Sequence, residues 1–511
     1  MAGDGDAGSA APRVKAPGAI FVVPLLVLLV HAVMHARVQG ISCIDDAYIS
    51  FQYARNLVEG HGLVFNPGER VEGYTNFGWV MLLSVVHALG ADLEASSRVL
   101  AFLCGAGLVS WVTAWFVRRG GAVVGGLVGL ALALDGTIAR WSQDGLETMF
   151  FAMIVAMAVT TRIDELDRDR TGVASSLLFA LCALTRPEGF VLFGLSWLAG
   201  LFAGGAVRDR VKRAVIEGLC FTGPTAIHVG WRLAYYGMPL PNTFYAKVGA
   251  SGAQVERGLA YTGQFWLLDR APLVLGAIAM LVATARAKWR LADAWVLAVV
   301  GVWLVYVTAV GGDWMGPGRF YAPILGVLLI GLGRRGLAAR EHGVGPGVGR
   351  PKVVLGAVLI AALLSGATSH LSERANLEVE RPLLDSRREL ALFLADAAEP
   401  DARLLTGEIG ALAWFSRLYT LDLYGLIDPE IARMDVETLG EGLPGHEKAD
   451  LGYSLAQEPT LIVIPGLMQA IMAGRPDPRL ADFEVRDTRI AAPIAVFRYV
   501  LVRRAAPSST E

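Results

Sequence analysis

Long hydrophobic runs separated by short polar segments form the main pattern of this chain, from residue 16 to residue 364. A hydrocarbon layer about 30 Å thick is crossed by a helix of roughly 20 apolar residues, although several of the runs are shorter than that. The pattern therefore predicts an α-helical polytopic membrane protein with about eleven transmembrane helices. The runs are 16–36, 96–117, 122–138, 149–161, 175–184, 190–206, 214–235, 272–285, 292–310, 321–332 and 353–364.

Basic residues are concentrated in every second loop between these runs, beginning with the amino terminus. The positive-inside rule places these loops in the cytoplasm and the other loops on the extracytoplasmic side of the plasma (inner) membrane. The first run lacks a convincing cleavage site, so we expect it to remain as the first span. Segment 77–89 has about 13 residues, too few to span, and is predicted to lie at the interface within a large first outer loop, 38–95.

Hydropathy falls after residue 368, where helical and strand-like segments begin to alternate. Segment 381–397 has a helical pattern, and the patterns of 403–407, 460–464 and 494–502 are typical of strands. We therefore expect a transmembrane domain over 1–368, an extracytoplasmic soluble α/β domain over 369–504 and a disordered tail over 505–511.

Composition agrees with a membrane protein, since 54% of the residues are hydrophobic and the mean hydropathy is +0.48. Three of the four cysteines lie in apolar runs, which predicts neither a disulfide framework nor a cysteine metal cluster. A net charge of −2 gives no indication of a nucleic-acid partner, and membrane lipids are the expected surroundings.

Two adjacent carboxylates, Asp45 and Asp46, stand where the chain leaves the membrane after the first hydrophobic run. One of them is suited to act as a general base that takes the proton of an attacking hydroxyl group. Its neighbour would raise the pKa of that base, or hold a metal or the acceptor. The alternative is structural, because aspartate caps helix amino termini well and a helix through 48–57 would start here. The sequence does not say which carboxylate has which role.

Most other unusual polar and aromatic motifs fall in the loops assigned to the outer side, which predicts a single site there. Glu147 starts a hydrophobic run, where an ionisable group is costly, and Arg186 offers a planar fork for a phosphate. The alternatives are helix caps, a local ion pair between Arg186 and Glu188, and an interfacial aromatic belt. The candidate donor- and acceptor-binding residues are Glu72, Tyr74, Asn76, Glu147, Arg186, Asn242, Tyr245, Lys247, Asp313, Trp314 and Arg319.

Short motifs distributed along most of the chain form a recognisable set. They are Asp45-Asp-Ala-Tyr-Ile with Arg55-Asn56, Gly62-Leu-Val-Phe-Asn-Pro-Gly-Glu69, Val71-Glu-Gly-Tyr-Thr-Asn76, Gly145-Leu-Glu147, Asn242-Thr-Phe-Tyr-Ala-Lys247, Gly312-Asp-Trp-Met with Gly318-Arg-Phe320, Gly407-Glu-Ile-Gly-Ala411 and Asp422-Leu-Tyr-Gly-Leu-Ile-Asp428. Together they resemble the GT-C membrane glycosyltransferases, which use polyprenyl-phosphate sugars. Within that class they are similar to the terminal arabinofuranosyltransferase branch of actinobacterial cell-wall arabinan and its bacterial relatives.

The resemblance implies a transferase that moves a sugar from a polyprenyl-phosphate donor to a glycan, lipid or protein acceptor of the cell envelope. It assigns the role of general base to Asp45 or Asp46, with Asp45 preferred. It also places Glu147 near the donor or a possible divalent metal, and Arg319 or Lys247 at the phosphate. Direct attack by the acceptor hydroxyl would invert the anomeric centre. The resemblance fixes neither the sugar nor the acceptor.

Two other classes of function remain as alternatives. A transporter or flippase of lipid-linked sugars would also combine many spans with charged residues, but no internal repeat is apparent and the motifs gather on one side. The other alternative is a non-catalytic envelope assembly protein, and the presence of both aspartates and Glu147 argues against it.

Overall fold

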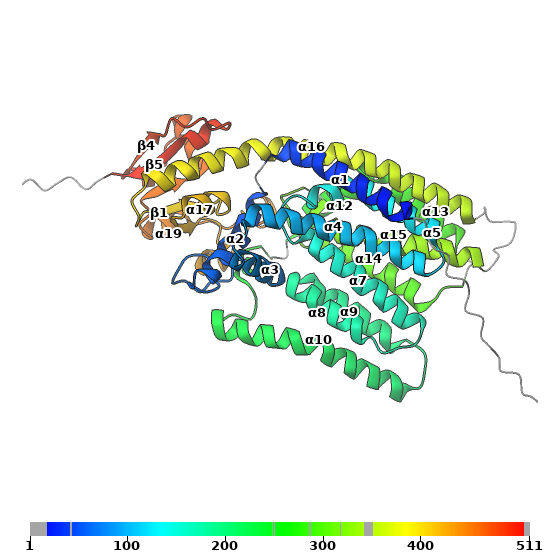
Figure 1. Cartoon of the computed structure of the whole chain (residues 1–511). Helices are drawn as coiled ribbons and strands as arrows, with labels where there is room; N and C mark the ends of the chain where they lie inside the picture. The colour runs from blue at the N-terminus through cyan, green and yellow to red at the C-terminus, as the bar shows by residue number, and fades with distance from the viewer. Residues whose placement is uncertain are drawn as a thin grey trace, which may run out of the picture.

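The structure, a computed structural model, describes residues 18–40, 43–247, 249, 251–285, 288–316, 318–341 and 351–504. Most of these residues lie in helices that run side by side, and a small β-sheet stands at one end of them (Figure 1). The predicted tail, 505–511, lies outside the described residues. The helices before the sheet, which we call the helix bundle, are α1 (Ala19–Gln39), α2 (Asp45–Val58), α3 (Phe77–Ala88), α4 (Leu93–Arg118), α5 (Ala122–Leu134), α6 (Gly136–Trp141), α7 (Thr148–Asp167), α8 (Val173–Thr185), α9 (Glu188–Leu201), α10 (Val207–Tyr236), α11 (Asn242–Lys247), α12 (Gly252–Gly263), the π-helix η1 (Gln264–Leu268), α13 (Ala271–Ala283), α14 (Leu291–Ala309), α15 (Gly318–Glu341) and α16 (Pro351–Ala397).

Several helices of the bundle are long and apolar enough to cross a membrane. In the described part of the chain these are α1, α4, α14 and α15, and a fifth span results if α12 and η1 are joined to α13 across a bend of 80°. Within the same described ranges, four shorter apolar helices, α3, α5, α8 and α9, contain 12 to 14 residues each. The protein is therefore a multi-pass membrane protein. Fewer helices reach full spanning length than the hydrophobic runs predict, because several runs form helices of only 13 or 14 residues, and Asp135 ends α5 inside the run 122–138.

The last helix of the bundle, α16, is a single helix of 47 residues. At 1.5 Å per residue it is roughly 70 Å long, and it extends from the bundle to the sheet (Figure 1). The predicted domain boundary at residues 368 and 369 falls inside this helix, and the helix predicted over 381–397 is its last part. The division into two domains stays a prediction, because one continuous helix belongs to both parts.

The sheet has five strands in the order β2-β1-β3-β5-β4. Strand β1 is parallel to β2 and β3, whereas β5 is antiparallel to β3 and β4. The strand predicted over 494–502 begins later than expected, because a 3₁₀ turn, η3 (Ala495–Arg498), precedes it and buries Phe497. With the helices between the strands, residues 403–504 form what we call the sheet module. Its strands are β1 (Arg403–Thr406), β2 (Tyr419–Asp422), β3 (Leu461–Val463), β4 (Phe483–Asp487) and β5 (Tyr499–Arg503).

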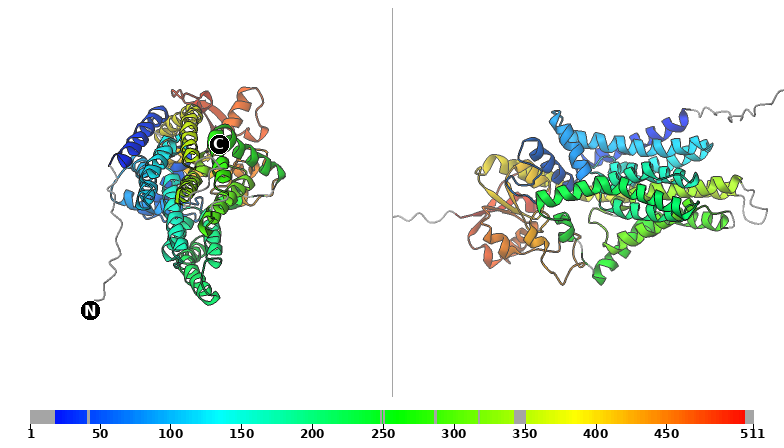
Figure 2. Two further views of the ribbon diagram at one scale, coloured as in Figure 1. Left: turned by 90° about the vertical axis from the view of Figure 1, so that its right-hand side faces the viewer. Right: turned by 90° about the horizontal axis from the view of Figure 1, so that it is seen from below.

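The sheet module contacts the bundle chiefly through α17 (Ala411–Ser416), which packs against α16 and also against α2. The ring of Trp414 lies 5.8 Å from that of Phe51, and the ring of Phe415 lies 5.2 Å from that of Tyr48. The right-hand view of Figure 2, seen from below, also shows the sheet module at one end of the bundle. In the loop that follows β1, Gly410 lies against Asp45 at the start of α2, and in the loop that follows β2, Leu426 and Ile427 lie against Gly73.

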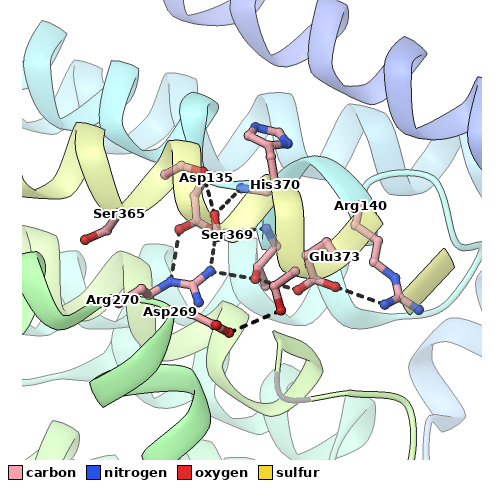
Figure 3. A network of polar contacts seen from close by, with 12 residues as sticks. Asp135, Arg140, Asp269, Arg270, Ser365, Ser369, His370 and Glu373 are labelled. Atoms are coloured by element: carbon pink, nitrogen blue, oxygen red, sulfur yellow. Dashed lines mark hydrogen bonds and ion pairs between the residues drawn. The ribbon is translucent and has the colours of Figure 1, made fainter. Parts of the chain in front are cut away.

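A buried polar network fastens α16 to α6 and α13 (Figure 3). The guanidinium of Arg140, in α6, is fully buried and contacts three carboxylates. Two of them belong to α16, Glu373 at 2.9 Å and Glu380 at 2.6 Å, and the third is Asp144 at 3.1 Å. Because one cation serves three acids on two segments, its removal would leave uncompensated charge in the interior.

The second half of the network joins the start of α13 to α6 and α16. Arg270 contacts Asp135 at 2.9 Å and donates to the hydroxyl of Thr137 at 2.7 Å. Thr137 in turn donates to Glu373 at 2.8 Å, which links the two arginines. The helices approach closely here, since a Cβ at Gly136 would lie 2.6 Å from the backbone of α16.

We expect Arg140→Met to lower the free energy of unfolding by about 3–5 kcal/mol, because it leaves buried carboxylates without a partner. Thermal unfolding in detergent measures this as a large fall in Tm. Arg374→Met is the matched control on α16, because Arg374 forms an exposed pair with Glu378, in which the side chains are 63% and 56% exposed. That pair is worth about 0–1 kcal/mol. Equal effects of the two substitutions would contradict the role given to Arg140.

Candidate active site

Asp45 and Asp46 are the first two residues of α2 and lie where the bundle meets the sheet module. Two negative charges in a first helical turn suit the positive end of the helix dipole. Ile44 is the N-cap residue and provides no side-chain cap. An N-cap role therefore does not explain the pair.

Asp45 is buried and contacts the sheet module. Its Oδ1 accepts a hydrogen bond from the backbone N of Ala411 at 3.0 Å and lies 3.6 Å from the guanidinium of Arg387. A Cβ at Gly410 would overlap the backbone and the carboxylate of Asp45, so only glycine fits there. The carboxylate of Asp45 is thus engaged in joining the two parts of the molecule.

Asp46 differs from its neighbour because its side chain is partly exposed. The loss of water around the carboxylate raises the pKa of Asp46 above the usual range of aspartate. The negative charges of Asp313 and Asp45 add to the rise, whereas the positive charges of Lys247 and Arg319 oppose it. Asp46 is therefore a carboxylate with a raised proton affinity beside two cations.

Lys247 ends α11 and is partly exposed. Its charge acts on Asp46, and a Cβ at Gly445 of the sheet module would lie 2.9 Å from its Cε. No hydrogen bond or ion pair engages its ammonium group within the described residues. An ammonium group that has no such partner among the described residues is suited to bind an anionic ligand.

The carboxylate of Glu147 is buried and shared by two guanidinium groups. Its Oε1 lies 3.0 Å from Nη1 of Arg186 and 3.4 Å from Nη2 of Arg319, and its Oε2 accepts from Nδ2 of Asn76 at 2.9 Å. Arg319 also contacts Asp313 at 3.1 Å. Segments that are far apart in the sequence are joined here. We call the combined group the polar cluster, which consists of Asp46, Asn76, Glu147, Arg186, Lys247, Asp313 and Arg319.

Four other predicted site residues are not members of the polar cluster and make contacts that stabilise the fold. Their roles in binding stay predictions. The contacts are those of Glu72 with Arg232 (2.7 Å), Tyr74 with Tyr236 (3.2 Å), Asn242 with the carbonyl of Gly425 (2.8 Å), and Tyr245, whose carbonyl accepts from Lys448 (2.9 Å).

The sheet module contributes side chains that sequence reasoning did not single out. The ring of His446 lies 6.1 Å from that of the predicted Trp314 and 4.9 Å from that of Tyr424. Glu408 forms an ion pair with Arg387 at 2.7 Å. Glu408 and Tyr424 belong to motifs that carry the resemblance, but the loop with His446 has no comparable signal.

In the described ranges, no group of three or more histidine, cysteine, aspartate or glutamate side chains is arranged to hold a metal ion. Apart from Asp46, the carboxylates of the polar cluster contact guanidinium groups. The arrangement combines one proton acceptor, Asp46, with a cation, Lys247, beside it.

The fold is shared with solved structures of another protein. The structure of ArnT from Cupriavidus metallidurans in the apo state aligns over 95% of this chain and 98% of that chain, with a TM-score of 0.59 and 15% sequence identity. The structure of ArnT bound to undecaprenyl phosphate aligns over 96% and 99%, with a TM-score of 0.56 and 15% identity. The chain therefore has an ArnT-like GT-C fold. A domain family of unknown function (DUF8728) matches residues 373–502, the end of α16 and the sheet module.

In sequence the chain is similar to two terminal β-(1→2)-arabinofuranosyltransferases. The protein of Mycobacterium tuberculosis is 30% identical over 267 residues, which are 48% of this chain and 41% of that protein. The protein of Corynebacterium glutamicum is 27% identical over 328 residues, or 56% and 47%. The alignments thus span less than half the length of each relative. The resemblance identified from the sequence motifs is confirmed.

We expect Asp45→Ala to lower the free energy of unfolding by about 1–3 kcal/mol, because it leaves the buried Ala411 N–H without an acceptor. We expect Asp46→Ala to leave the free energy of unfolding unchanged, or to raise it, at pH 7. A carboxyl whose folded-state pKa is raised is destabilising once ionised, so its removal costs nothing. Thermal unfolding and hydrogen exchange of residues 407–416 measure both effects. Faster exchange in Asp46→Ala than in Asp45→Ala would contradict this division of roles.

Proposed function

We propose that this protein is a membrane glycosyltransferase that moves a sugar from a polyprenyl-phosphate donor to a glycan, lipid or protein acceptor of the cell envelope. The observation that carries the proposal is the partly exposed Asp46 beside Lys247, at the junction of the helix bundle and the sheet module. The reaction needs a base for the acceptor hydroxyl and a positive charge for the departing phosphate. The ArnT-like fold and the similarity to arabinofuranosyltransferases support the same reaction class.

In the proposed reaction, the hydroxyl oxygen of the acceptor attacks the anomeric carbon of the donor sugar. Asp46 takes the hydroxyl proton as the new carbon–oxygen bond forms. The bond between the anomeric carbon and the phosphate oxygen breaks, and the polyprenyl phosphate leaves with the electron pair. Lys247 compensates the charge of the phosphate, and attack from the opposite face inverts the anomeric centre.

We assign the general base to Asp46, although the resemblance to the family favoured Asp45. The carboxylate of Asp45 is occupied by Ala411 and Arg387. Asp46 is more exposed, and its raised pKa makes it a stronger base than an ordinary aspartate.

We further propose about eleven spans, several of them shorter than a full crossing. The amino terminus would face the cytoplasm, and the polar cluster and sheet module would lie on the extracytoplasmic side of the plasma membrane. Support comes from the far end of the bundle, where Arg334 contacts Asp167 at 2.8 Å and Asp293 at 2.7 Å. A group of basic residues, Arg208, Arg210, Lys212 and Arg213, also lies at the start of α10, whereas Tyr236 at the other end of that helix contacts Tyr74. The positive-inside rule assigns such a basic end to the cytoplasm. An arabinofuranosyl donor is the first to test, because it is the sugar in the names of both relatives.

Asp46→Asn is expected to reduce sugar transfer by about 10²–10⁴-fold, because the amide cannot take the proton of the acceptor hydroxyl. The assay follows radiolabelled sugar from polyprenyl-phosphate donors to acceptors in membranes with matched expression. Glu59→Gln, at the other end of α2, is the control and should transfer at the wild-type rate. Wild-type transfer by Asp46→Asn would overturn the assignment of the base, and absence of transfer by the wild type from a broad donor panel would overturn the function.

Lys247→Met is expected to raise the KM for the donor roughly ten-fold or more, because the phosphate loses a charge-assisted contact. It should also change the pH profile. Asp46 must be ionised to act, so transfer falls as the pH drops through its pKa. Removal of the positive charge of Lys247 raises that pKa, and the acid limb then moves to higher pH. Lys212→Met, exposed on α10, should change neither quantity. A shift of the acid limb to lower pH would contradict the proposal.

A further inference from the structure

A loop of the sheet module, residues 439–448, is fastened to the helix bundle beside the polar cluster. We call it the clasp loop. Oε1 of Glu447 lies 2.7 Å from Nη1 of Arg257, in α12, and accepts from the backbone N of Gly440 at 2.6 Å. Arg257 also donates through Nε to the carbonyl of Gly311 at 3.1 Å. One arginine thus holds the clasp loop together with the loop that carries Asp313.

The clasp loop presents His446 to the polar cluster. Gly445, the preceding residue, packs against the side chain of Lys247. The imidazole of His446 is partly exposed, and its edge-to-face contacts with the rings of Tyr424 and Trp314 fix its orientation. No other residue of the clasp loop combines this position with a side chain able to bind a polar ligand.

The hydrogen bonding of His446 defines which ring nitrogen is free. Nδ1 lies 3.2 Å from the carbonyl of Pro444, and a carbonyl only accepts, so Nδ1 carries the proton. Nε2 then has a lone pair, and no partner for it is found in the described part of the chain. Burial and the charge of Lys247 hold the pKa of His446 below its usual range, against the opposing charges of Asp46 and Glu408, so the ring is neutral at pH 7.

We infer that His446 is an acceptor-binding residue, whose Nε2 accepts a hydrogen bond from a hydroxyl group of the acceptor sugar. The inference rests on the proposed function and assigns the acceptor as a carbohydrate. Tyr424 and Trp314 form the aromatic surroundings in which a sugar ring would sit.

The chemistry of the site separates this role from donor binding. A phosphate at neutral pH offers acceptor oxygens, which the lone pair of Nε2 repels, whereas a sugar hydroxyl donates. Lys247 has the opposite preference and favours the phosphate. The two residues adjoin through Gly445, so the acceptor hydroxyl and the donor phosphate would meet beside Asp46.

The test compares His446→Ala, His446→Gln and the wild type for binding of an octyl-linked arabinofuranosyl disaccharide, measured by calorimetry without donor. We expect the Kd for the disaccharide to rise about ten-fold in His446→Ala, because the loss of one hydrogen bond weakens binding by about that factor. His446→Gln keeps an acceptor oxygen in a similar place and should stay within about three-fold of the wild type. Leu443→Ala, exposed in the same loop, is the control and should bind as the wild type does. The KM for the donor should be equal in all four proteins.

Three outcomes would overturn the inference about His446. The first is unchanged disaccharide binding in His446→Ala, and the second is no binding by the wild type. The third is a rise in the KM for the donor without a change in disaccharide binding. The proposed function is judged separately with Asp46→Asn, which should bind the disaccharide and fail to transfer. A wild type that binds the disaccharide but transfers no sugar from any donor would overturn the function and leave the role of His446 in carbohydrate binding intact.

Discussion

The contact of Arg140 with three buried carboxylates is the interaction on which the arrangement of the site depends. It fixes α6 against α16 and holds Asp144 at the start of the segment that leads to Glu147. The carbonyl of Asp144 accepts from the backbone N of Ile44 at 3.3 Å, directly before the two aspartates. A buried cation with three partners has few alternative positions, so the loop to Glu147 and the start of α2 are placed by the same contact.

Glu147 extends this constraint into the polar cluster. Its carboxylate holds Arg186, from the break between α8 and α9, and Arg319, from the start of α15. Breaks in apolar runs expose backbone groups and are stable in a membrane protein where polar residues from the protein surround them. The site therefore lies where helices of the bundle begin or end, and the loops after β1 and β2 cover it from the other side.

The sequence predicted the class of fold, and all seven residues of the polar cluster were among its candidate site residues, because ionisable residues at the ends of apolar runs are rare and costly enough to be informative. It did not predict how many helices reach full spanning length, because composition alone does not show that Asp135 breaks the run 122–138. It also divided the chain at residue 368, since the polar half of α16 loses the hydrophobic signal while the helix continues. His446 was not predicted, because its position depends on the contact of Glu447 with Arg257, which are separated by 190 residues.

The sequence also left the roles of Asp45 and Asp46 open, and the geometry of a helix explains why they differ. Successive residues of an α-helix point about 100° apart around its axis, so adjacent side chains at a helix start face different neighbours. Asp45 faces Ala411 and Arg387 and binds the sheet module, whereas Asp46 has Lys247 and Arg319 nearby. The contact of Asp45 holds the sheet module, and with it the clasp loop, against the helix that carries Asp46. A substitution at either aspartate would therefore reduce transfer, but only the loss of Asp45 would also loosen the sheet module. Measurements of both stability and activity are therefore needed to distinguish the general base, Asp46, from the residue that holds the sheet module in place, Asp45.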